Sequence, residues 1–183
     1  MLLNQQTDFS SVSKIRIAII SDTHNDLAPE IIQTITECDI AVHAGDIGCS
    51  DVLATMQPRW GHIIAVAGNN DKPYLWEFKD WNLVKNLPHH IDLVVPSGQI
   101  SIEHGHLHDM YKPSHSDLRA AHPDSRLVIY GHTHIEVIDT DNPQQHVLNP
   151  GASGYTRNKG GPSSIILSID GDNWDYQVLK FSS

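Results

Sequence analysis

Five short apolar runs, each followed at once by polar residues, constrain the fold of this 183-residue chain more than any other feature. Each run is short, rich in β-branched residues and bounded by glycine or polar residues, which is typical of a strand buried on both faces. The runs cover 15–20, 40–44, 63–67, 100–103 and 127–130, and the clusters behind them read SDTHND, GD, GNND, HGH and GHTH. We therefore predict buried strands whose ends carry polar side chains.

Helix signals separate the first three runs. The segment 27–38 has isoleucines at helical spacing behind Pro29, and the segment 50–57 opens with Ser50 as a capping residue. Strands that alternate with helices indicate right-handed crossovers and a largely parallel sheet. Ligand sites in open sheets of this kind lie outside the carboxyl ends of the strands, where the polar clusters fall.

The pattern of residues changes beyond Leu127. Strand-like runs at 136–140, 146–150, 163–170 and 174–181 are separated by turn-forming residues, with no room for crossover helices. This pattern predicts an antiparallel second sheet. The fold class that follows is α/β, with two sheets packed face to face and helices outside.

Composition narrows the classes of function. Aspartate and glutamate number 22 against 12 lysine plus arginine, a formal net charge of -10, which disfavours extended nucleic-acid binding. The amino terminus is polar where a signal peptide would be apolar, and no run reaches membrane-spanning length. Cys38 and Cys49 form no CxxC pair. We expect a cytoplasmic protein without a membrane partner, with a flexible tail over 1–14 and a single domain over 15–183.

The polar clusters contain donors of one chemical kind, oxygen and imidazole nitrogen, without a thiolate. Such donors suit Mn, Fe, Zn, Co or Ni, whereas a cysteine-rich set would indicate structural Zn. Carboxylates that converge at one sheet edge repel each other, and bound cations are the usual remedy. The donors are Asp22, His24, Asp46, Asn69, Asp71, His104, His106, His132 and His134.

The number of donors favours two ions over one. A single catalytic ion takes about three or four protein ligands, fewer than the clusters offer. Paired ions share a bridging carboxylate at a separation of about 3.5–4 Å. Asp46 stands alone after its run, and Gly45 allows close backbone approach there, so Asp46 is the natural bridge.

The motifs DxH, GD, GN, HGH and GHTH, in this order, resemble those of the calcineurin-like metallophosphoesterases. The short chain and the NPGAS that follows the last histidine pair are similar to the small prokaryotic phosphodiesterase branch. The resemblance runs from Asp22 to about Ser153 and implies a four-layer αββα sandwich of two mixed sheets flanked by helices. By the same resemblance Asp22, His24, Asp46 and His134 hold one ion, and Asp46, Asn69, His104 and His132 hold the other.

One position departs from the family pattern. The family has a histidine after the asparagine of its GN motif, with a role at the leaving group, whereas this chain has Asn70. An amide can donate a hydrogen bond to phosphate but cannot deliver a proton at neutral pH. His106 is a second candidate for a catalytic role at the rim. His43 is either a partner of a ligand or a core histidine, and Asp71 either a loop cap or a residue that orients a ligand.

The resemblance implies phosphodiester hydrolysis of a small substrate by a metal-bound hydroxide, with two divalent ions of which Mn²⁺ is the one we expect. A phosphomonoesterase, a nuclease and a scaffold that keeps the fold without chemistry are the alternatives. The natural substrate and the oligomeric state stay open, a homo-oligomer included. Outside the motifs, His62, His89, His90, His115, His122 and His146 are expected to be solvated side chains.

Overall fold

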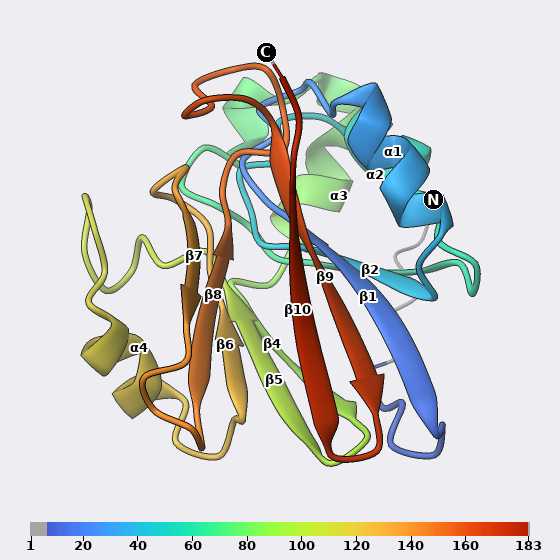
Figure 1. Ribbon diagram of the computed structural model, residues 1–183. Helices are drawn as coiled ribbons and strands as arrows, with labels where there is room; N and C mark the ends of the chain where they lie inside the picture. The colour runs from blue at the N-terminus through green and yellow to red at the C-terminus, as the bar shows by residue number, and fades with distance from the viewer. Residues whose placement is uncertain (1–6, 183) are drawn as a thin grey trace.

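The computed structural model describes residues 7–182 and contains two five-stranded sheets packed face to face (Figure 1). Both sheets are mixed, which confirms the α/β fold class. The first sheet has the spatial order β10 (Asn173–Lys180), β9 (Ser163–Asp170), β1 (Lys14–Ile20), β2 (Ile40–His43) and β3 (His62–Ala65). The second has the order β4 (His90–Val95), β5 (Gly98–Glu103), β6 (Leu127–Ile129), β8 (His146–Pro150) and β7 (Glu136–Asp139).

The prediction of an antiparallel second sheet beyond Leu127 is wrong. β9 pairs antiparallel with β1, so the last two strands complete the first sheet. In the second sheet β6 pairs parallel with both β5 and β8. Turn chemistry between the late strands identifies hairpins, such as β9–β10, but does not show which sheet a hairpin joins.

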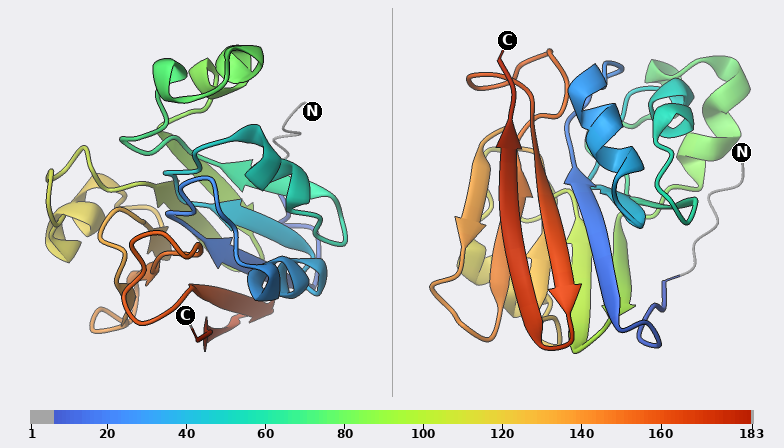
Figure 2. Two further views of the ribbon diagram at one scale, coloured as in Figure 1. Left: turned by 90° about the horizontal axis from the view of Figure 1, so that it is seen from above. Right: turned by 45° about the vertical axis from the view of Figure 1, so that its right-hand side comes forward.

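Helices cover the outer faces of both sheets and give four layers, as the two views of Figure 2 show. The helices are α1 (Pro29–Thr36), α2 (Ser50–Thr55), α3 (Trp81–Lys85) and α4 (His115–Ala121), with 3-10 turns at Pro73–Leu75 and Phe78–Asp80. Ile31 and Ile35 of α1 pack with Ala18 and Ile20 on the first sheet. Leu118 of α4 packs with Val128 on the second.

The main core lies between the sheets. Alternate residues of β1, such as Ile17 and Ile19, meet Ile100 and Ile129 of the second sheet. Full burial of an aliphatic side chain contributes about 1.5–3 kcal/mol, so this interface fixes the two sheets against each other. The loops at the sheet ends therefore stand on a rigid base.

The described part of the predicted tail is held by the second sheet. Residues 1–6 of the expected tail lie outside the described residues. From residue 7 the chain runs beside β4: Val94 N donates to Thr7 O at 2.7 Å and Phe9 N to Val94 O at 2.8 Å. Phe9 is buried, because its apolar ring belongs to the core between the two sheets. No helix among residues 7–182 is long and apolar enough to cross a membrane.

Candidate metal centre

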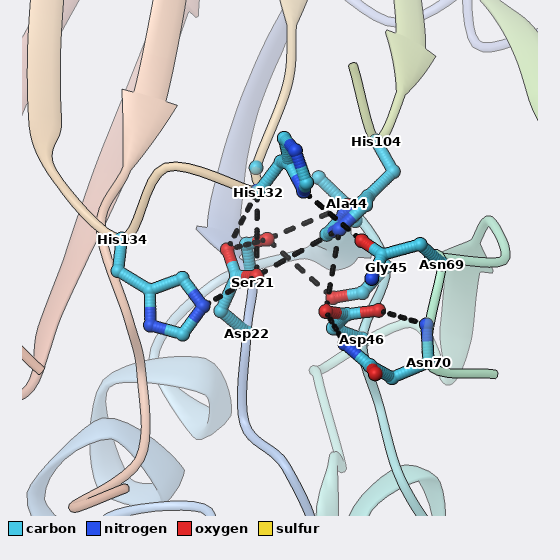
Figure 3. A network of polar contacts seen from close by, with 12 residues as sticks. Ser21, Asp22, Ala44, Gly45, Asp46, Asn69, Asn70, His104, His132 and His134 are labelled. Atoms are coloured by element: carbon cyan, nitrogen blue, oxygen red, sulfur yellow. Dashed lines mark hydrogen bonds and ion pairs between the residues drawn. The ribbon is translucent and has the colours of Figure 1, made fainter. Parts of the chain in front are cut away.

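The polar clusters meet at one end of the two sheets (Figure 3). The loops after β1, β2 and β3 come from the first sheet, and the loops after β5 and β6 from the second. β1, β2 and β3 pair in parallel, so their carboxyl ends face the same edge. The site is therefore assembled from five loops that are remote in sequence, as the sequence predicts.

The backbone at the predicted ligands is strained. Left-handed φ values are uncommon for residues other than glycine and cluster at functional sites. Of the eight such residues between residues 7 and 182, five are predicted ligands: Asp22 (φ 54°), His24 (47°), Asp46 (56°), His132 (70°) and His134 (57°). Each conformation turns the chain sharply just beyond a strand end, which points the side chain into the site.

The first predicted donor set is assembled. Asp22, His24, Asp46 and His134 offer one ligand atom each, and these atoms all lie within 4.8 Å of one another. His134 Nε2 lies 3.3 Å from Asp22 Oδ1 and 3.2 Å from His24 Nε2. His134 Nδ1 donates to Arg157 O at 3.1 Å, so a neutral ring directs its Nε2 lone pair at the other donors. This tautomer is the one that binds a metal through Nε2.

His104 belongs to the second predicted set and is the clearest sign of an ion. Its Nδ1 donates to Ala44 O at 2.7 Å. Its Nε2 is buried without a hydrogen-bond partner and lies 3.4 Å from Asp46 Oδ2. A buried polar atom without a partner is costly, and a cation between Nε2 and the carboxylate would satisfy it. The donors present therefore fit a divalent ion.

His132 and Asn69 complete the second set. His132 Nδ1 lies 3.0 Å from Asn69 Oδ1, and its Nε2 lies 2.8 Å from Met110 O. A neutral imidazole carries one proton, so it can donate to only one of these oxygens. If Nε2 donates to Met110, the Nδ1 lone pair and the Asn69 oxygen form a pair of acceptors. Such a pair suits a cation.

The electrostatic field of the site is negative. Burial lowers the pKa of His104, but the carboxylates of Asp46 and Asp22 outweigh burial and raise this pKa to about 9. Burial raises the pKa of Asp46, but His104 and two hydrogen bonds from Asn70 outweigh it and lower this pKa overall. A field that holds a proton on a fully buried imidazole attracts a divalent cation still more strongly.

Two glycines allow the loops to come this close. A Cβ on Gly68 would collide with the carboxylate of Asp46, and one on Gly131 would collide with Ser21 Oγ and the carboxylate of Asp22. The glycines of the GN and GHTH motifs are thus required by close approach to the two carboxylates.

His43 and Asp71 fix the first-sheet loops. Gly45 N donates to His43 Nδ1 at 3.2 Å, and His43 Nε2 lies 2.9 Å from Thr23 Oγ1. Burial, the largest influence, lowers the pKa of His43 to about 3, so the ring is neutral and donates from Nε2. His43 therefore bridges the loops that carry Asp22 and Asp46; it is a buried residue of β2 that hydrogen-bonds their neighbours Thr23 and Gly45, not a predicted ligand.

The Asp71 carboxylate accepts hydrogen bonds from three backbone amides, Ile47 N at 3.0 Å, Gly48 N at 3.0 Å and Gly68 N at 2.9 Å. Asp71 thereby caps its own loop and ties it to the loop of Asp46. Its two sequence-based interpretations, cap and orienting residue, describe one set of bonds.

The two predicted catalytic residues take different places. Asn70 is engaged with the bridging carboxylate: its backbone N donates to Asp46 Oδ1 at 2.8 Å and its Nδ2 to Asp46 Oδ2 at 2.7 Å. His106 lines the adjacent cavity, and its buried Nδ1 has no hydrogen-bond partner. Burial, followed by the charges of His104 and His132, lowers the pKa of His106 to about 4.

The sequence-based reasoning missed two residues at the site. Ser21 Oγ donates to Asp22 Oδ2 at 2.6 Å, and an NH₂ group of Arg157 lies 3.4 Å from His24 Nδ1. Ser21 directly precedes a predicted ligand, which is a usable signal. Arg157 lies in the glycine-rich loop 151–162, and no spacing in the sequence relates it to His24.

A cavity of about 570 Å³ adjoins the site. One end is formed by Asn69, Asn70 and His132, and Lys72 and Lys85 also line it. Apolar atoms contribute through other lining residues, among them Pro73, Val84, Leu87 and Met110. The cavity thus offers cationic and apolar contacts beside the donor sets.

A model of the calcineurin-like phosphoesterase superfamily domain matches residues 15–172, and the chain belongs to this superfamily. A probable metallophosphoesterase from Methanothermobacter thermautotrophicus is 26% identical over 169 residues, which cover 90% of this chain and 91% of that protein. Membership identifies a metal-dependent phosphoric ester hydrolase fold, and the donor clusters accord with divalent metal binding.

Solved structures show the same architecture. An archaeal phosphodiesterase is 28% identical with a TM-score of 0.59, covering 90% of this chain and all (100%) of that one. A mutant of Vps29 from Entamoeba histolytica is 16% identical with a TM-score of 0.70, covering 92% of this chain and 100% of its own. At this identity the Vps29 likeness shows the fold alone.

Proposed function

We propose that this protein is a dinuclear-metal-dependent phosphodiesterase that acts on a small substrate. The observation that carries the proposal is the converged donor set Asp22, His24, Asp46 and His134, with the buried His104 Nε2 3.4 Å from the Asp46 carboxylate. The ligands would be Asp22, His24, Asp46 and His134 for one ion, and Asp46, Asn69, His104 and His132 for the other.

Two divalent ions bound here would lower the pKa of a coordinated water toward about 7 and polarise the phosphoryl group. Nitrogen and oxygen donors without thiolate favour Mn²⁺, with Fe, Zn, Co and Ni as alternatives. The two carboxylates of Asp22 and Asp46 would offset about half of the charge of two such ions. A positive centre would remain to attract a phosphate in this acidic protein.

The residues around the ligands have separate tasks in this proposal. Asn70 holds both oxygens of Asp46 in place through its two hydrogen bonds. His106 lines the cavity and can donate a hydrogen bond to an ester oxygen. Arg157 lies beside His24 and can pair with a non-bridging phosphate oxygen.

The cavity can accommodate the organic group of a phosphodiester. A phosphodiester carries a second organic group, which needs space next to the ligands. The cavity beside Asn69 and His132 provides that space, with apolar walls at Val84 and Leu87. A monoester carries one organic group, which this volume could also hold, so the choice between diester and monoester rests on the substrate screen.

A metal-by-substrate screen tests the proposal. Chelated protein is reloaded with Mn²⁺, Zn²⁺, Co²⁺ or Ni²⁺ and assayed on bis(p-nitrophenyl) phosphate, p-nitrophenyl phosphate and an oligonucleotide. We expect the diester to be hydrolysed fastest, with Mn²⁺ active. Faster hydrolysis of the monoester, or cleavage of the oligonucleotide in preference to the small diester, would contradict the proposed phosphodiesterase activity on a small substrate.

Elemental analysis separates an enzyme from a scaffold. The wild-type protein should hold two more Mn²⁺ ions per chain than the double variant Asp22→Asn/Asp46→Asn. Equal metal content in the two proteins, with no turnover on any ester, would contradict the proposed function.

A further inference from the structure

A second group of histidines and carboxylates lies away from the proposed ligands. Glu103 ends β5, His108 follows in the next loop, and His122 caps the C-terminal end of α4. Their ligand atoms all lie within 4.8 Å of one another. Successive residues of a strand face opposite sides of a sheet, so the side chains of Glu103 and its neighbour His104 lie on different faces.

The distances within this group are those of hydrogen-bonded pairs, a little shorter than those between the ligands of an ion. His122 Nε2 lies 2.8 Å from Glu103 Oε2, and His108 Nε2 lies 3.0 Å from Glu103 Oε1. Donors around a tetrahedral ion with bonds of about 2.0–2.1 Å stand roughly 3.4 Å apart. Outward shifts of a few tenths of an ångström would therefore admit an ion between the three side chains.

Glu103 supplies a second observation. Its side chain is only 10% exposed, and its Oε2 accepts from both imidazoles, at 2.8 Å from His122 Nε2 and 3.1 Å from His108 Nε2. Its Oε1 is buried and lies 3.0 Å from His108 Nε2, but it receives no hydrogen bond of acceptable geometry, whereas a buried carboxylate oxygen normally does. The expectation that His122 is solvated is also wrong, since its side chain is 10% exposed and its Nε2 faces Glu103.

We propose that Glu103, His108 and His122 bind a divalent transition-metal ion of the Zn²⁺ class. Two imidazoles and one carboxylate are a common protein ligand set for Zn²⁺, with a fourth position left to water. The neighbouring His90 and Asp92 are left out of the set because their side chains are 40% and 44% exposed, and Asp92 Oδ1 also accepts from Ser101 Oγ at 2.6 Å.

The proposed ion would tie the segment 105–121 to the end of β5, and we call this metal link the clip. The segment leaves β5 beside Glu103 and returns to it at His122, and His108 lies between. The same segment carries Met110, whose carbonyl oxygen lies 2.8 Å from His132 Nε2 and which lines the cavity. A metal at Glu103 thus holds one rim of the proposed catalytic site without contacting the substrate.

Metal stoichiometry after equilibrium dialysis against Zn²⁺ tests the site. We expect Glu103→Gln and His108→Gln each to hold one Zn²⁺ ion per chain fewer than wild type. His90→Asn is the matched control on the same sheet face and should retain the full number. Equal zinc content in wild type, Glu103→Gln and His108→Gln would overturn the proposal, and loss of an ion in His90→Asn would overturn this choice of ligands.

This test of zinc content does not depend on the proposed function. The double variant Asp22→Asn/Asp46→Asn should still bind one Zn²⁺ ion with wild-type affinity, even if the main centre holds none. Circular dichroism checks that each variant is folded, and the exposed His108 provides a change that leaves the buried Glu103 intact.

Limited proteolysis of the folded protein provides a second readout. Tyr111 is 88% exposed within the segment, so chymotrypsin can cleave there. Zn²⁺ should slow this cleavage several-fold in the Asp22→Asn/Asp46→Asn variant and have no effect once Glu103→Gln is added. Equal protection in both proteins would contradict the clip.

Discussion

The two sheets contribute unlike halves to the proposed centre. The first-sheet loops carry both carboxylates, Asp22 and Asp46, as well as His24 and Asn69, and the buried hydrogen bonds of His43 and Asp71 tie these loops together. The second-sheet loops carry the imidazoles, and one of them exposes Met110 (78%) and Tyr111 (88%). The first-sheet half, which we call the fixed half, supplies both carboxylates, and the more open second-sheet half supplies imidazoles alone.

This division has a physical reason. A displaced carboxylate leaves unbalanced charge in a buried site, whereas a displaced imidazole loses one neutral bond. Charged ligands therefore need the more rigid support. Neutral ligands can be placed on loops that also shape the cavity.

Metal removal should have the largest effect, because both halves depend on the ions. We expect exhaustive chelation to abolish diesterase activity and Mn²⁺ to restore it. Loss of the ions should also lower the free energy of unfolding, since ligand at 100 times its Kd stabilises the folded state by about 2.7 kcal/mol. Activity assays and thermal melts with and without Mn²⁺ measure both. Full activity in metal-free protein would end the metal hypothesis.

Asp46→Asn should cost more activity than any other single ligand change. It removes charge from both ions at once, so we expect a loss in kcat/KM on the order of 10³-fold. His24→Ala and His132→Ala, one from each half, are the comparisons and should be milder. Near-normal turnover of Asp46→Asn with two bound ions would show that Asp46 is not the bridge.

Asp71→Asn tests the support of the fixed half without touching a ligand. Asn offers one oxygen where the carboxylate accepts three backbone hydrogen bonds. We expect a loss of about 1.5–3 kcal/mol in the free energy of unfolding and roughly 10–100-fold weaker Mn²⁺ binding. Urea unfolding and metal titration measure these effects, with the exposed Asp124→Asn as control. Unchanged metal affinity would mean that the loops hold their shape without Asp71.

Much of the part of the site that the first sheet contributes could be predicted from the sequence. The short runs before Asp22, Asp46 and Asn69 identify parallel strands, and the carboxyl ends of parallel strands must meet. The second half was harder to predict, because hairpin signals identify strand pairs but not the sheet that they join. For this reason the sequence-based prediction puts β9 and β10 in the wrong sheet, although it locates the motif of His132 and His134.

The contacts that could not be predicted from the sequence join residues that lie far apart along the chain. Arg157 approaches His24 across a separation of 133 residues, and no local pattern encodes that contact. Glu103 and His122 lie 19 residues apart, and each alone is an ordinary surface residue type. His43 could not be assigned until its two hydrogen bonds showed that it bridges two loops.

The smallest predicted effect concerns Asn70, which lies on a loop of the fixed half and lines the cavity where we expect the substrate. Alkoxide leaving groups need a proton to depart, and an amide cannot supply one. Aryl leaving groups stabilise their own charge. We therefore expect turnover to fall steeply as the pKa of the leaving group rises.

Replacing Asn70 with histidine should flatten that dependence, because imidazole can act as a general acid near neutral pH. The slope of log kcat against leaving-group pKa, at saturating Mn²⁺, measures it. Asn70→Ala is the matched control: it removes the 2.7 Å bond to Asp46 Oδ2 without adding an acid, so it should lower all rates by a similar factor. If all three proteins give the same shallow slope, another group such as His106 delivers the proton, and Asn70 serves only to hold the carboxylate that bridges the two ions.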